Sequence, residues 1–527
     1  MGTDNLHISP RTGDPVTDIG LDTISTEKQA LVFVNTKRSA EACADRLADA
    51  VKKHLPIATR HSLSDKVRNV LSSPTKQCNR LADAVTHQVA FHHSGLHSEQ
   101  RSSVEEAFKD GKIQVIAATP TLAAGLDMPA FRVVIRDLKR YSGGWGMQPI
   151  PVLEYEQMSG RAGRPGYDDE GQAITIAETA SEKEDIQEQY VAADPEPIQS
   201  KLAARPTLRT YTLSLVATGF VSDDDELTGF MDETFYAHQY GDDEKLHSQL
   251  HMVKDNLRNW NMIESQMDTS EEPVFVSAKE YSQSDELDAT RLGHRVSELY
   301  LDPYTANKLV HRLRAAGESP DPFAVLLAIS YTLEMRPLIR VKKGDSQAVE
   351  ARLWKHEDNL LHDAPDQYED DYKEFLNAVK TAAVLHDWIN EVSEQELDER
   401  WGVTPGHLQA KRSLADWLLY SCDEILDVID APDIQRMIRR LRERVNLGVK
   451  DDLLALTKFD GIGRVRARRL YKADIQDAGD VKDTAFEKVQ DILGPKTGKQ
   501  LKKQVGQTVD TETVKRETHG NLLDFKD

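Results

Sequence analysis

The sequence predicts a multidomain α/β plus α protein, in which a lobe built on a parallel sheet precedes several helix-rich domains. The length of 527 residues is enough for about three to five domains. Up to about residue 193, short apolar runs alternate with helical patterns, which is typical of a parallel sheet covered by helices. From residue 194 onwards, apolar residues recur mainly at three- and four-residue steps, and this spacing predicts helices.

Four blocks of the first lobe carry polar residues close to a predicted strand. Three of them begin at Ala30 (ALVFVNTKRSAE), Phe91 (FHHSGLHSEQR) and Val115 (VIAATPTLAAGLDMPA), and each runs from an apolar strand into a polar turn. The fourth covers Gln157 to Gly166 (QMSGRAGRPG). Because ligands of a parallel sheet lie at the carboxyl ends of its strands, we expect the polar residues of all four blocks there.

The fourth block pairs two arginines, Arg161 and Arg164, between glycines and after Gln157. A guanidinium group is a permanently charged planar fork that matches phosphate oxygens. Held near a terminal phosphate, it stabilises the charge that develops during phosphoryl transfer. The alternative is a glycine-rich turn with two solvated arginines.

The four blocks resemble motifs IV, IVa, V and VI of superfamily 2 helicases, and GRAGRPG with TLAAGLDMPA resembles the Ski2-like branch. From about residue 29 to 506 the chain is similar to the archaeal Ski2-like DNA helicases that act at stalled forks, relatives of the helicase half of DNA polymerase theta. The resemblance implies a RecA-like lobe over residues 29–193. It also implies an ATP-dependent 3′–5′ DNA helicase acting in replication-fork repair and recombination.

The resemblance assigns roles to the residues of these blocks. Arg161 and Arg164 would reach the γ-phosphate of ATP bound with Mg²⁺, and Gln157 would orient them or sense the nucleotide. Gly125 and Asp127 would couple the nucleotide state to the grip on DNA, with Asp127 near the ribose. Short polar groups at the strand ends would hold DNA phosphates, namely Asn35, Thr36, His93, Ser94, Thr119 and Thr121.

A complete motor of this class has a first RecA-like lobe with a phosphate-binding loop and an acidic Mg²⁺ box, and neither occurs here. Gly494–Gln500 has a spacer one residue short, and no Ser or Thr follows its lysine. Asp285–Asp288 is acidic, but no apolar strand precedes it. We expect a P-loop lobe in another chain, or a fragment or truncated gene, and no ATP hydrolysis by this chain alone. Residues 1–28 are expected to be a polar leader or linker.

A β-hairpin is predicted at about residues 132–153, where two apolar runs flank the glycine-rich turn Ser142–Gly146. Cations and aromatic residues gather near its tip, a combination that suits contact with unpaired bases. In the resembled family a hairpin here separates the strands, whereas the alternative is an ordinary decorated loop. The candidate DNA contacts are Arg140, Tyr141 and Trp145.

Two helical segments follow. Residues 194–290 fit a winged helix, but its DDDE and GDDE runs favour packing against the motor over DNA contact. Residues 291–447 resemble the family's helical ratchet domain, in which Trp417 matches a tryptophan that stacks on a base. The family's arginine falls at Ala410, so Arg412 or Lys411 could replace it only by facing another direction. Trp417 could instead be a core residue among neighbouring leucines.

Residues 448–506 show a helix-hairpin-helix pattern, with Gly461 and Gly463 in the turn. Glycines let backbone amides approach a phosphate at a helix N-terminus. Between Arg436 and Lys472 there are twelve Lys or Arg against four Asp or Glu. We therefore expect DNA contacts from Gly461, Gly463, Arg464 and Arg466. In the tail, 507–527, the spacing of Leu522 and Phe525 matches a sliding-clamp-binding peptide only weakly, because the usual glutamine is missing.

The composition bounds the remaining possibilities. A net charge of −22 is unusual for a partner of nucleic acid, and the scattered acidity suggests a salt-adapted cytoplasm in which folding is best above molar salt. The resemblance implies that this cytoplasm is archaeal. Salt weakens phosphate contacts, so stacking should matter more. Three widely spaced cysteines indicate neither a zinc site nor an iron–sulfur cluster. No apolar run reaches about 18 residues and no secretory signal opens the chain, so no membrane partner is expected.

Two other functions stay open at this point. The chain could be a non-catalytic DNA-binding remnant or an accessory subunit of a split helicase, whose DNA binding no nucleotide would alter. It could also be a Ski2-like RNA helicase. The helix-hairpin-helix pattern and the lack of a long arch insertion argue against RNA.

Overall fold

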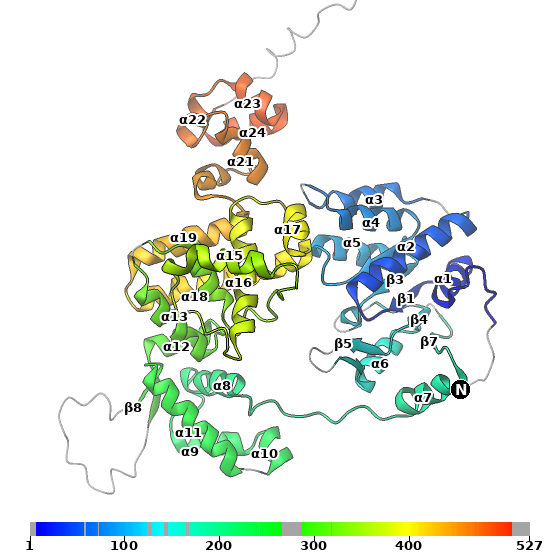
Figure 1. Cartoon of the computed structure of the whole chain (residues 1–527), viewed down its shortest axis with the longest axis horizontal. Helices are drawn as coiled ribbons and strands as arrows, with labels where there is room; N and C mark the ends of the chain where they lie inside the picture. Colours follow the sequence, from blue (N-terminus) through cyan, green and yellow to red (C-terminus); the bar gives the residue numbers. More distant parts are fainter. Residues whose placement is uncertain are drawn as a thin grey trace, which may run out of the picture. The chain divides into compact units, whose positions relative to one another are not determined.

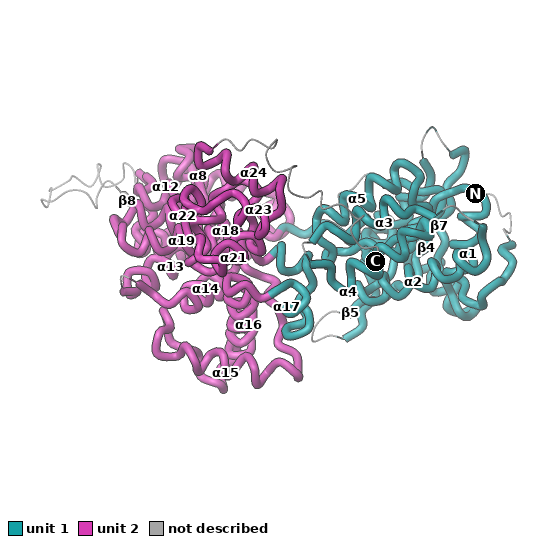
Figure 2. Tube along the Cα trace, turned by 90° about the horizontal axis from the view of Figure 1, so that it is seen from above, with its two compact units in different colours: residues 1–200, 393–410 teal, residues 201–392, 411–527 magenta. Residues whose placement is uncertain are grey.

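The computed structural model describes residues 7–56, 59–71, 73–123, 128–141, 146–164, 166, 168–241, 243–265, 286–317 and 319–507. The chain divides into two compact units, coloured differently in Figure 2. Unit 1 comprises residues 1–200 and 393–410, and unit 2 comprises residues 201–392 and 411–527. No helix among the described residues combines the length and the apolar character needed to cross a membrane.

Unit 1 is built on a five-stranded sheet in the order β2-β3-β1-β4-β7, with every neighbouring pair parallel. The strands are β1 (Ala30–Phe33), β2 (Val89–His92), β3 (Val115–Ala118), β4 (Arg132–Ile135) and β7 (Gln172–Thr175). The first four are buried along their whole length, which explains why they are continuous apolar runs. The predicted parallel sheet is confirmed.

Helices cover this sheet (Figure 1). They are α1 (Pro15–Ser25), α2 (Lys37–His54), α3 (His61–Arg68), α4 (Lys76–Thr86) and α5 (Ser98–Lys109). Short polar residues begin several of them, since the side chains of Thr36 and Thr75 accept hydrogen bonds from the first-turn amides of α2 and α4. The apolar faces of the helices join the strands in one core.

Helix α1 differs from the expected polar leader. Asp14 caps it, Pro15 occupies its first turn, and apolar residues from Val16 to Ile24 are buried in the core of the lobe. Its Gly20 lies so close to α2 that an added Cβ would meet Leu47 at 2.4 Å. The polar residues interspersed in PVTDIGLDTIS hide this pattern in the sequence, because several of them, such as Thr23, are themselves buried.

A short antiparallel hairpin follows β4, formed by β5 (Lys139–Tyr141) and β6 (Met147–Pro149). It is shorter than the predicted hairpin, because Val133–Ile135 belong to the central strand β4. After it come α6 (Val152–Ser159), α7 (Ala180–Ile186) and a π-helical turn, η3, at Gln187–Val191. A 3₁₀ turn, η1 (Pro120–Leu122), follows β3.

Unit 2 opens with a group of helices and one small sheet, in which β8 and β9 pair antiparallel. Residues 266–285, between these two strands, lie outside the described residues. The elements of this group are α8 (Arg205–Ala217), α9 (Asp224–Asp232), α10 (Phe235–Tyr240), α11 (Asp243–Asn259), β8 (Ile263–Ser265), β9 (Leu287–Ala289) and α12 (Arg291–Glu298).

A helical bundle comes next, with α14 fully buried over Phe323–Ser330. Such a helix is apolar on every side because it has no face to solvent. The bundle contains α13 (Pro303–Ala315), α14 (Pro322–Ser330), α15 (Ser346–His356), the turn η5 (Glu357–Asn359), α16 (Tyr372–Ile389), the greater part of α18 (Pro405–Val428) and α19 (Pro432–Leu447).

The last module has its own small core, formed by apolar residues from Val449 to Leu501. Its elements are η6 (Asp451–Leu453), α20 (Leu454–Thr457), α21 (Arg464–Tyr471), α22 (Ala478–Asp483), α23 (Phe486–Leu493) and α24 (Pro495–Gln504). The segment Gly494–Gln500, which resembles a phosphate-binding loop in sequence, is the beginning of α24. The tail from residue 508 lies outside the described residues.

Residues 393–410 return to unit 1, where they supply α17 (Glu394–Trp401) and the start of α18. The Gly406 amide donates to the Gly95 carbonyl at 3.0 Å, and a Cβ on Gly406 would meet the Leu96 and Ser94 carbonyl oxygens at 2.2 and 2.6 Å. Ser98 and Gln409 exchange two hydrogen bonds of 3.0 and 2.7 Å beside this contact. Only glycine permits so close an approach of two backbones.

We expect Gly406→Ala to loosen the start of α18 from the lobe, because the new methyl group meets backbone atoms that cannot move cheaply. The cost should be about 1 to 3 kcal/mol. Hydrogen exchange at residues 94–98 and 404–409 measures the effect. Gly229→Ala in α9 is the matched control, since its Cβ meets nothing within 4 Å, and it should be neutral or slightly stabilising. Unchanged protection in Gly406→Ala would show that this contact does not hold the helix.

Candidate nucleotide and DNA-binding sites

Polar residues follow three strands at the carboxyl edge of the sheet. The Asn35 backbone amide donates to Asp137 Oδ2 at 2.9 Å, and its side-chain amide donates to the Lys139 carbonyl at 3.0 Å. The hydroxyls of Thr119 and Thr121 lie 2.9 Å apart. Thr36 and Thr121 are exposed, whereas Thr119 is buried and Asn35 is half-buried. The structure thus brings four of the predicted phosphate contacts to one edge.

His93 does not belong to this exposed set. Its ring is fully buried, stacks on Phe91 and accepts a 3.1 Å hydrogen bond at Nδ1 from the Gly95 amide. Its Nε2 lies 3.3 Å from Glu41 Oε1, and burial lowers the pKa of His93 below its ordinary value. The expectation that His93 holds a DNA phosphate is therefore corrected, because the ring shapes the turn onto which α18 docks. The neighbouring Ser94 is exposed.

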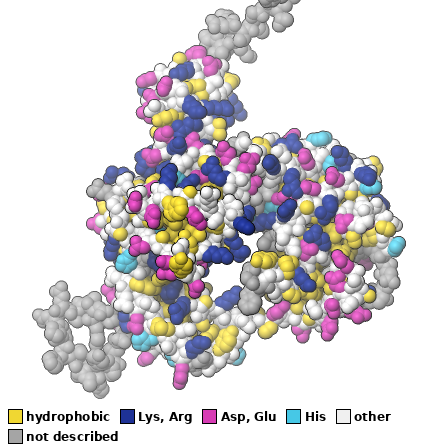
Figure 3. Space-filling view, in the orientation of Figure 1, with side chains coloured by type: hydrophobic (Ala, Val, Ile, Leu, Met, Phe, Trp, Pro, Cys, Tyr) yellow, Lys and Arg dark blue, Asp and Glu magenta, His cyan; other side chains and the backbone are white. Residues whose placement is uncertain are grey.

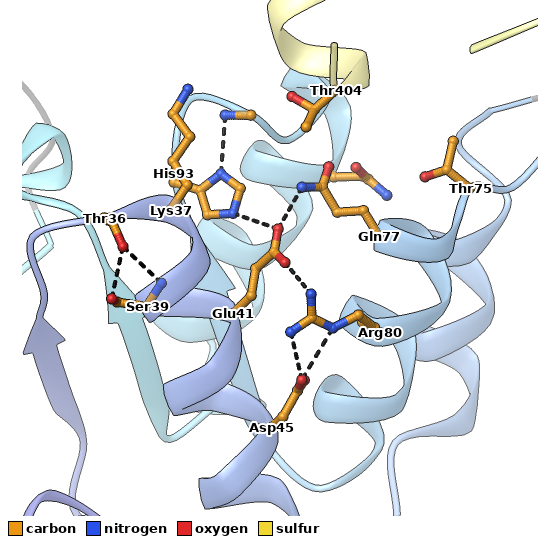
Figure 4. A network of polar contacts seen from close by, with 12 residues as sticks. Thr36, Lys37, Ser39, Glu41, Asp45, Thr75, Gln77, Arg80, His93 and Thr404 are labelled. Atoms are coloured by element: carbon orange, nitrogen blue, oxygen red, sulfur yellow. Dashed lines mark hydrogen bonds and ion pairs between the residues drawn. The ribbon is translucent and has the colours of Figure 1, made fainter. Parts of the chain in front are cut away.

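Glu41 is the centre of the polar network behind His93 (Figure 4). Gln77 donates to Glu41 Oε1 at 2.7 Å, and Arg80 bridges Glu41 and Asp45. Burial opposes the charge of Glu41, but hydrogen bonds from His93 and Gln77 and the charge of Arg80 keep its pKa below the ordinary value. The network ties α2, α4 and the turn after β2 together, and sequence patterns gave no sign of it.

The arginine block lies at the other edge of the sheet. Just before β4 begins, the Ala130 amide donates to the Arg161 carbonyl at 2.9 Å, and the Gly163 amide donates to the Ala130 carbonyl at 2.7 Å. Arg164 donates to Gln29 Oε1 at 2.7 Å, immediately before β1. The expectation that this block sits at the carboxyl ends is thus wrong. The block follows the helix α6, which returns the chain to the amino edge, and not a strand.

Arg164 is held in an internal ion pair. Its Nε and Nη2 donate to the two Asp168 oxygens at 2.6 and 3.0 Å, and Lys28 Nζ lies 2.7 Å from Asp168 Oδ1. The Asp168 side chain is 1% exposed and that of Arg164 is 22% exposed. Hydrogen bonds from Arg164 and Lys28 outweigh burial and lower the pKa of Asp168 to about 2.

The other predicted nucleotide residues differ in their surroundings. Arg161 is half-buried and donates from Nη2 to the Ala123 carbonyl at 2.6 Å. Gln157 is exposed on α6. Gly125 and Asp127 lie outside the described residues.

The hairpin presents one aromatic side chain to solvent, because Tyr141 on β5 is 65% exposed. Arg140 is exposed as well, but its Nη1 forms an ion pair of 2.5 Å with Glu154 on α6. Trp145 lies outside the described residues. Among the described residues of the hairpin, the predicted contact Tyr141 is thus exposed, whereas the predicted contact Arg140 already has a partner within the lobe.

Trp417 on α18 is half-buried and donates from Nε1 to the Leu299 carbonyl at 3.2 Å. The predicted Arg412 and Arg464 both stack on a different tryptophan, Trp388, each with its guanidinium carbon 4.4 Å from the ring. They also donate to backbone carbonyls, including that of Val445. The structure therefore gives these two arginines a packing role, and sequence patterns did not single out Trp388.

In the last module, Gly461 has a φ of 78° and Gly463 caps α21. Arg466 is exposed and donates to the Gly461 carbonyl at 2.7 Å. Much of the basic run is neutralised by ion pairs, namely Arg439–Asp423, Arg440–Asp451, Arg442–Asp416 and Arg468 with Glu391 and Asp452. Acidic and basic side chains accordingly intermingle over the surface in Figure 3. Exposed cations remain at Lys458, Arg466, Arg469 and Lys472.

Within the part of the chain that the structure describes, no three His, Cys, Asp or Glu side chains converge as metal ligands would. Cys43, Cys78 and Cys422 are buried free thiols.

Comparison with known proteins agrees with this arrangement. The family of the helicase conserved C-terminal domain matches residues 64–166, within the sheet lobe, and that of archaeal helicase domain 4 matches residues 323–448. The ATP-dependent DNA helicase Hel308 of Pyrococcus horikoshii is 36% identical over 504 residues, which cover 95% of this chain and 67% of the relative. The chain belongs to the archaeal Hel308 family of Ski2-like DNA helicases.

Two further Hel308 relatives give the same picture. The Methanocella arvoryzae protein is 38% identical over 94% of this chain and 65% of its own length. The Methanococcus vannielii protein is 33% identical over 93% of this chain and 67% of its own length. The chain thus spans about two thirds of the length of these Hel308 proteins, and its sheet lobe is a helicase C-terminal lobe.

We expect the Asp168 ion pairs of this Hel308 lobe to stabilise it above pH 4 and to lose that effect as the pH falls toward 2. In the folded state the pKa of Asp168 is lowered to about 2, below its value of 3.8 in the unfolded chain. The ionised carboxylate therefore stabilises the folded state fully above pH 4, and this stabilisation is lost as the pH falls through the folded pKa. Asp168→Asn should therefore cost about 1 to 3 kcal/mol at pH 7. Its difference from the unsubstituted chain should shrink between about pH 4 and 2.

Hydrogen exchange of the backbone around residues 160–172 over this pH range measures the effect of Asp168→Asn. The exposed neighbour Asp169 provides the control Asp169→Asn, which should change little at any pH. A difference of equal size at pH 7 and pH 2 would contradict the assigned role of the ion pairs.

Proposed function

We propose that this chain supplies the second motor lobe and the DNA-gripping domains of an ATP-dependent 3′–5′ DNA helicase that acts in replication-fork repair and recombination. The proposal rests on the separation of two groups of polar residues at opposite edges of the sheet. The arginine block lies at the amino edge of the sheet and the short polar strand-end residues lie at the carboxyl edge. A motor lobe needs two such separate sites, because it converts a change at the nucleotide into a movement of the strand.

At the amino edge, Arg161 and Arg164 would contact the γ-phosphate of ATP, with Gln157 beside them. The P-loop and the Mg²⁺ carboxylates would come from outside these 527 residues. Arg164 would exchange Asp168 for the phosphate, since both are anions that fit the guanidinium fork. Gly125 and Asp127 would link this site to the DNA grip.

At the carboxyl edge, Asn35, Thr36, Ser94, Thr119 and Thr121 would hold DNA phosphates through short polar groups and backbone amides. The hairpin, with Arg140, Tyr141 and Trp145, would lie at the junction where strands separate, with Tyr141 offered to a base.

Helix α18 supports a mechanical link within this scheme. It docks onto the lobe through Gly406 and carries Trp417 eleven residues further on, which corresponds to about 16 Å along the helix. In the proposed motor this helix would thus connect the lobe through the chain to the residue proposed to stack on a base.

Two modules complete the proposed grip. Residues 194–290, with the pair β8–β9 behind α11, would form a winged helix that packs against the motor. Residues 448–506 would form a helix-hairpin-helix module that binds backbone phosphate through Gly461, Gly463 and Arg466. The net charge of −22 and the archaeal origin of the relatives support a salt-adapted archaeal cytoplasm as the setting.

One observation favours a second candidate, a non-catalytic DNA-binding subunit. The ion pair with Asp168 fixes the guanidinium that a motor would use at the phosphate. In such a subunit Arg164 would serve only to fold the lobe, and neither an ATP analogue nor a partner lobe would alter DNA binding.

An ATPase assay separates the two candidates. We expect the purified chain to hydrolyse no ATP with single-stranded DNA, and turnover to appear when the P-loop lobe of a Hel308 relative is added. Arg164→Ala should then lower turnover by about a thousandfold or more while DNA affinity stays unchanged. Arg46→Ala on α2, which removes an exposed arginine, is the control. Turnover by the chain alone would refute the need for an external lobe, and turnover unchanged by Arg164→Ala would refute the role of this arginine.

A salt titration of duplex affinity tests the helix-hairpin-helix assignment. Because backbone contacts carry no sequence information, removing Arg466 and Arg469 together should weaken binding equally for all sequences. It should also reduce the slope of log affinity against log salt by about 1 for each phosphate that the double variant no longer neutralises. Lys488→Ala on α23 of the same module is the control. A slope that the double variant leaves unchanged would place the phosphate contacts elsewhere.

A further inference from the structure

Unit 2 contains a pocket of about 300 Å³ between the start of α8, α13, the segment after α14 and the start of α16. An adjoining hollow of about 380 Å³ shares Arg209 and Tyr304 with it and adds Trp260. None of these residues belongs to the sites described above. The side chains that the argument uses are Arg209, Tyr304, Lys308, Tyr331, Arg336 and Trp260.

Aromatic rings and cations alternate along the pocket. Lys308 Nζ lies 4.4 Å from the centre of the Tyr304 ring and 5.9 Å from that of Tyr331. The Arg209 guanidinium lies 5.2 Å from the Tyr304 ring, and Trp260 lies 5.8 Å from it on the side of the adjoining hollow. The Tyr304 residue is nevertheless 41% exposed, so part of it remains accessible to a ligand. Such alternation is typical of surfaces on which unpaired bases stack.

The charges of the pocket are balanced. Arg209 donates to both Asp302 oxygens at 3.0 and 2.7 Å, and Arg336 is paired with Glu374. The Tyr331 hydroxyl donates to Asp371 at 2.9 Å. The lining of the pocket thus contains three cations and three carboxylates, and two of the cations are held in ion pairs. A groove that tracks the phosphate backbone needs an excess of positive charge, and this pocket has none.

A neutral planar ligand fits these conditions. The volume is at the lower end of the range for small-molecule sites, so it suits a single base and not a length of strand. Among the residues that line the pocket, the exposed Asp371 offers a carboxylate acceptor to the polar edge of such a ring. The hydroxyls of Thr305 and Thr332 are buried and donate to Glu334 and to the Ile329 carbonyl.

A short stretch of chain connects the pocket to a residue that contacts Trp417. Trp417 donates to the carbonyl of Leu299, at the end of α12, and Tyr304 stands five residues further on in the first turn of α13. A strand whose base stacks on Trp417 would have this short connection to cross before its next bases met the pocket. The inference that follows rests on the DNA-binding role proposed for this chain.

We propose that the pocket binds one unpaired nucleobase, which stacks on Tyr304 beside Lys308 and Tyr331. Stacking on this ring adds to the grip on single-stranded nucleic acid without adding phosphate contacts. Its contribution therefore persists in high salt, where contacts between cations and phosphates fade. A chain with 22 more acidic than basic residues depends on such contacts more than a basic one does.

Fluorescence anisotropy with a labelled oligo(dT) tests the proposal on the full chain, at low and at high salt. Tyr304→Leu removes the π-face and should weaken binding about 5- to 100-fold at both salt concentrations, whereas Tyr304→Phe should bind like the unsubstituted chain. Tyr368→Leu is the control, since this tyrosine is 88% exposed and lies outside both hollows. Equal affinity of Tyr304→Leu and the unsubstituted chain would overturn the proposal.

Photocrosslinking of the unsubstituted chain gives a result that does not depend on how well a variant folds. An oligonucleotide with 5-iodouracil should crosslink to the peptide that contains Tyr304, and a crosslinked set without that peptide would overturn the proposal. Calorimetry with deoxyadenosine monophosphate distinguishes the source of the base. Binding of the free nucleotide that Tyr304→Leu abolishes, with strand affinity unchanged, would assign the pocket to a free nucleotide instead of a strand.

The same data separate this inference from the proposed function. If the unsubstituted chain binds no single-stranded DNA, the proposed function fails. If it binds and Trp417→Ala weakens binding while Tyr304→Leu does not, only the pocket inference fails.

Discussion

The contact on which most of this architecture depends joins the Gly406 backbone to the turn after β2. It positions the first turn of α18 against the lobe at a distance that leaves no room for a side chain. The buried His93 ring shapes that turn, and Glu41 with Arg80 supports the ring from two helices. A phosphate-binding histidine would have to be exposed, so the same residue could not serve both purposes. The turn after β2 therefore serves first to anchor the start of α18. Ser94 is its exposed residue, and it is the residue of the turn that a DNA strand could contact.

The parallel sheet could be predicted from sequence because β1, β2 and β3 are short, mainly apolar runs that each end in a polar turn. The site could be predicted only in part. Residue type predicted a phosphate role for Arg164, which stays a prediction. The edge of the sheet at which Arg164 lies is set by the helix before it, and its partner Asp168 is set by the tertiary fold. Likewise, a count of basic residues near α21 overlooked the acidic partners, such as Glu391 for Arg468, that come from distant parts of the chain. Local patterns carry no information on such pairings.

The acidity of the chain and the pairing of its cations have a common consequence. Where Arg412 and Arg464 would be expected to meet phosphate, they pack on Trp388, and the arginines of α19 are largely bound to aspartates. An arginine that already forms an ion pair within the protein gains little free energy by moving to a DNA phosphate, because the internal pair must first be broken. Aromatic rings carry no such cost. In the proposed function, partly exposed rings such as Trp417 and Tyr304 would therefore contribute most to the binding of an unpaired strand.

The ion pair between Arg164 and Asp168 need not oppose a motor function. An arginine that is required only while a nucleotide is bound would be costly if left unpaired in a half-buried site between turnovers. Asp168 gives it an anion in that interval, and Lys28 keeps the carboxylate itself compensated when Arg164 leaves. A γ-phosphate carries more charge than a carboxylate and offers three oxygens, so it can compete for the guanidinium. In the proposed motor the pair would act as a resting position, from which binding of ATP would withdraw the arginine.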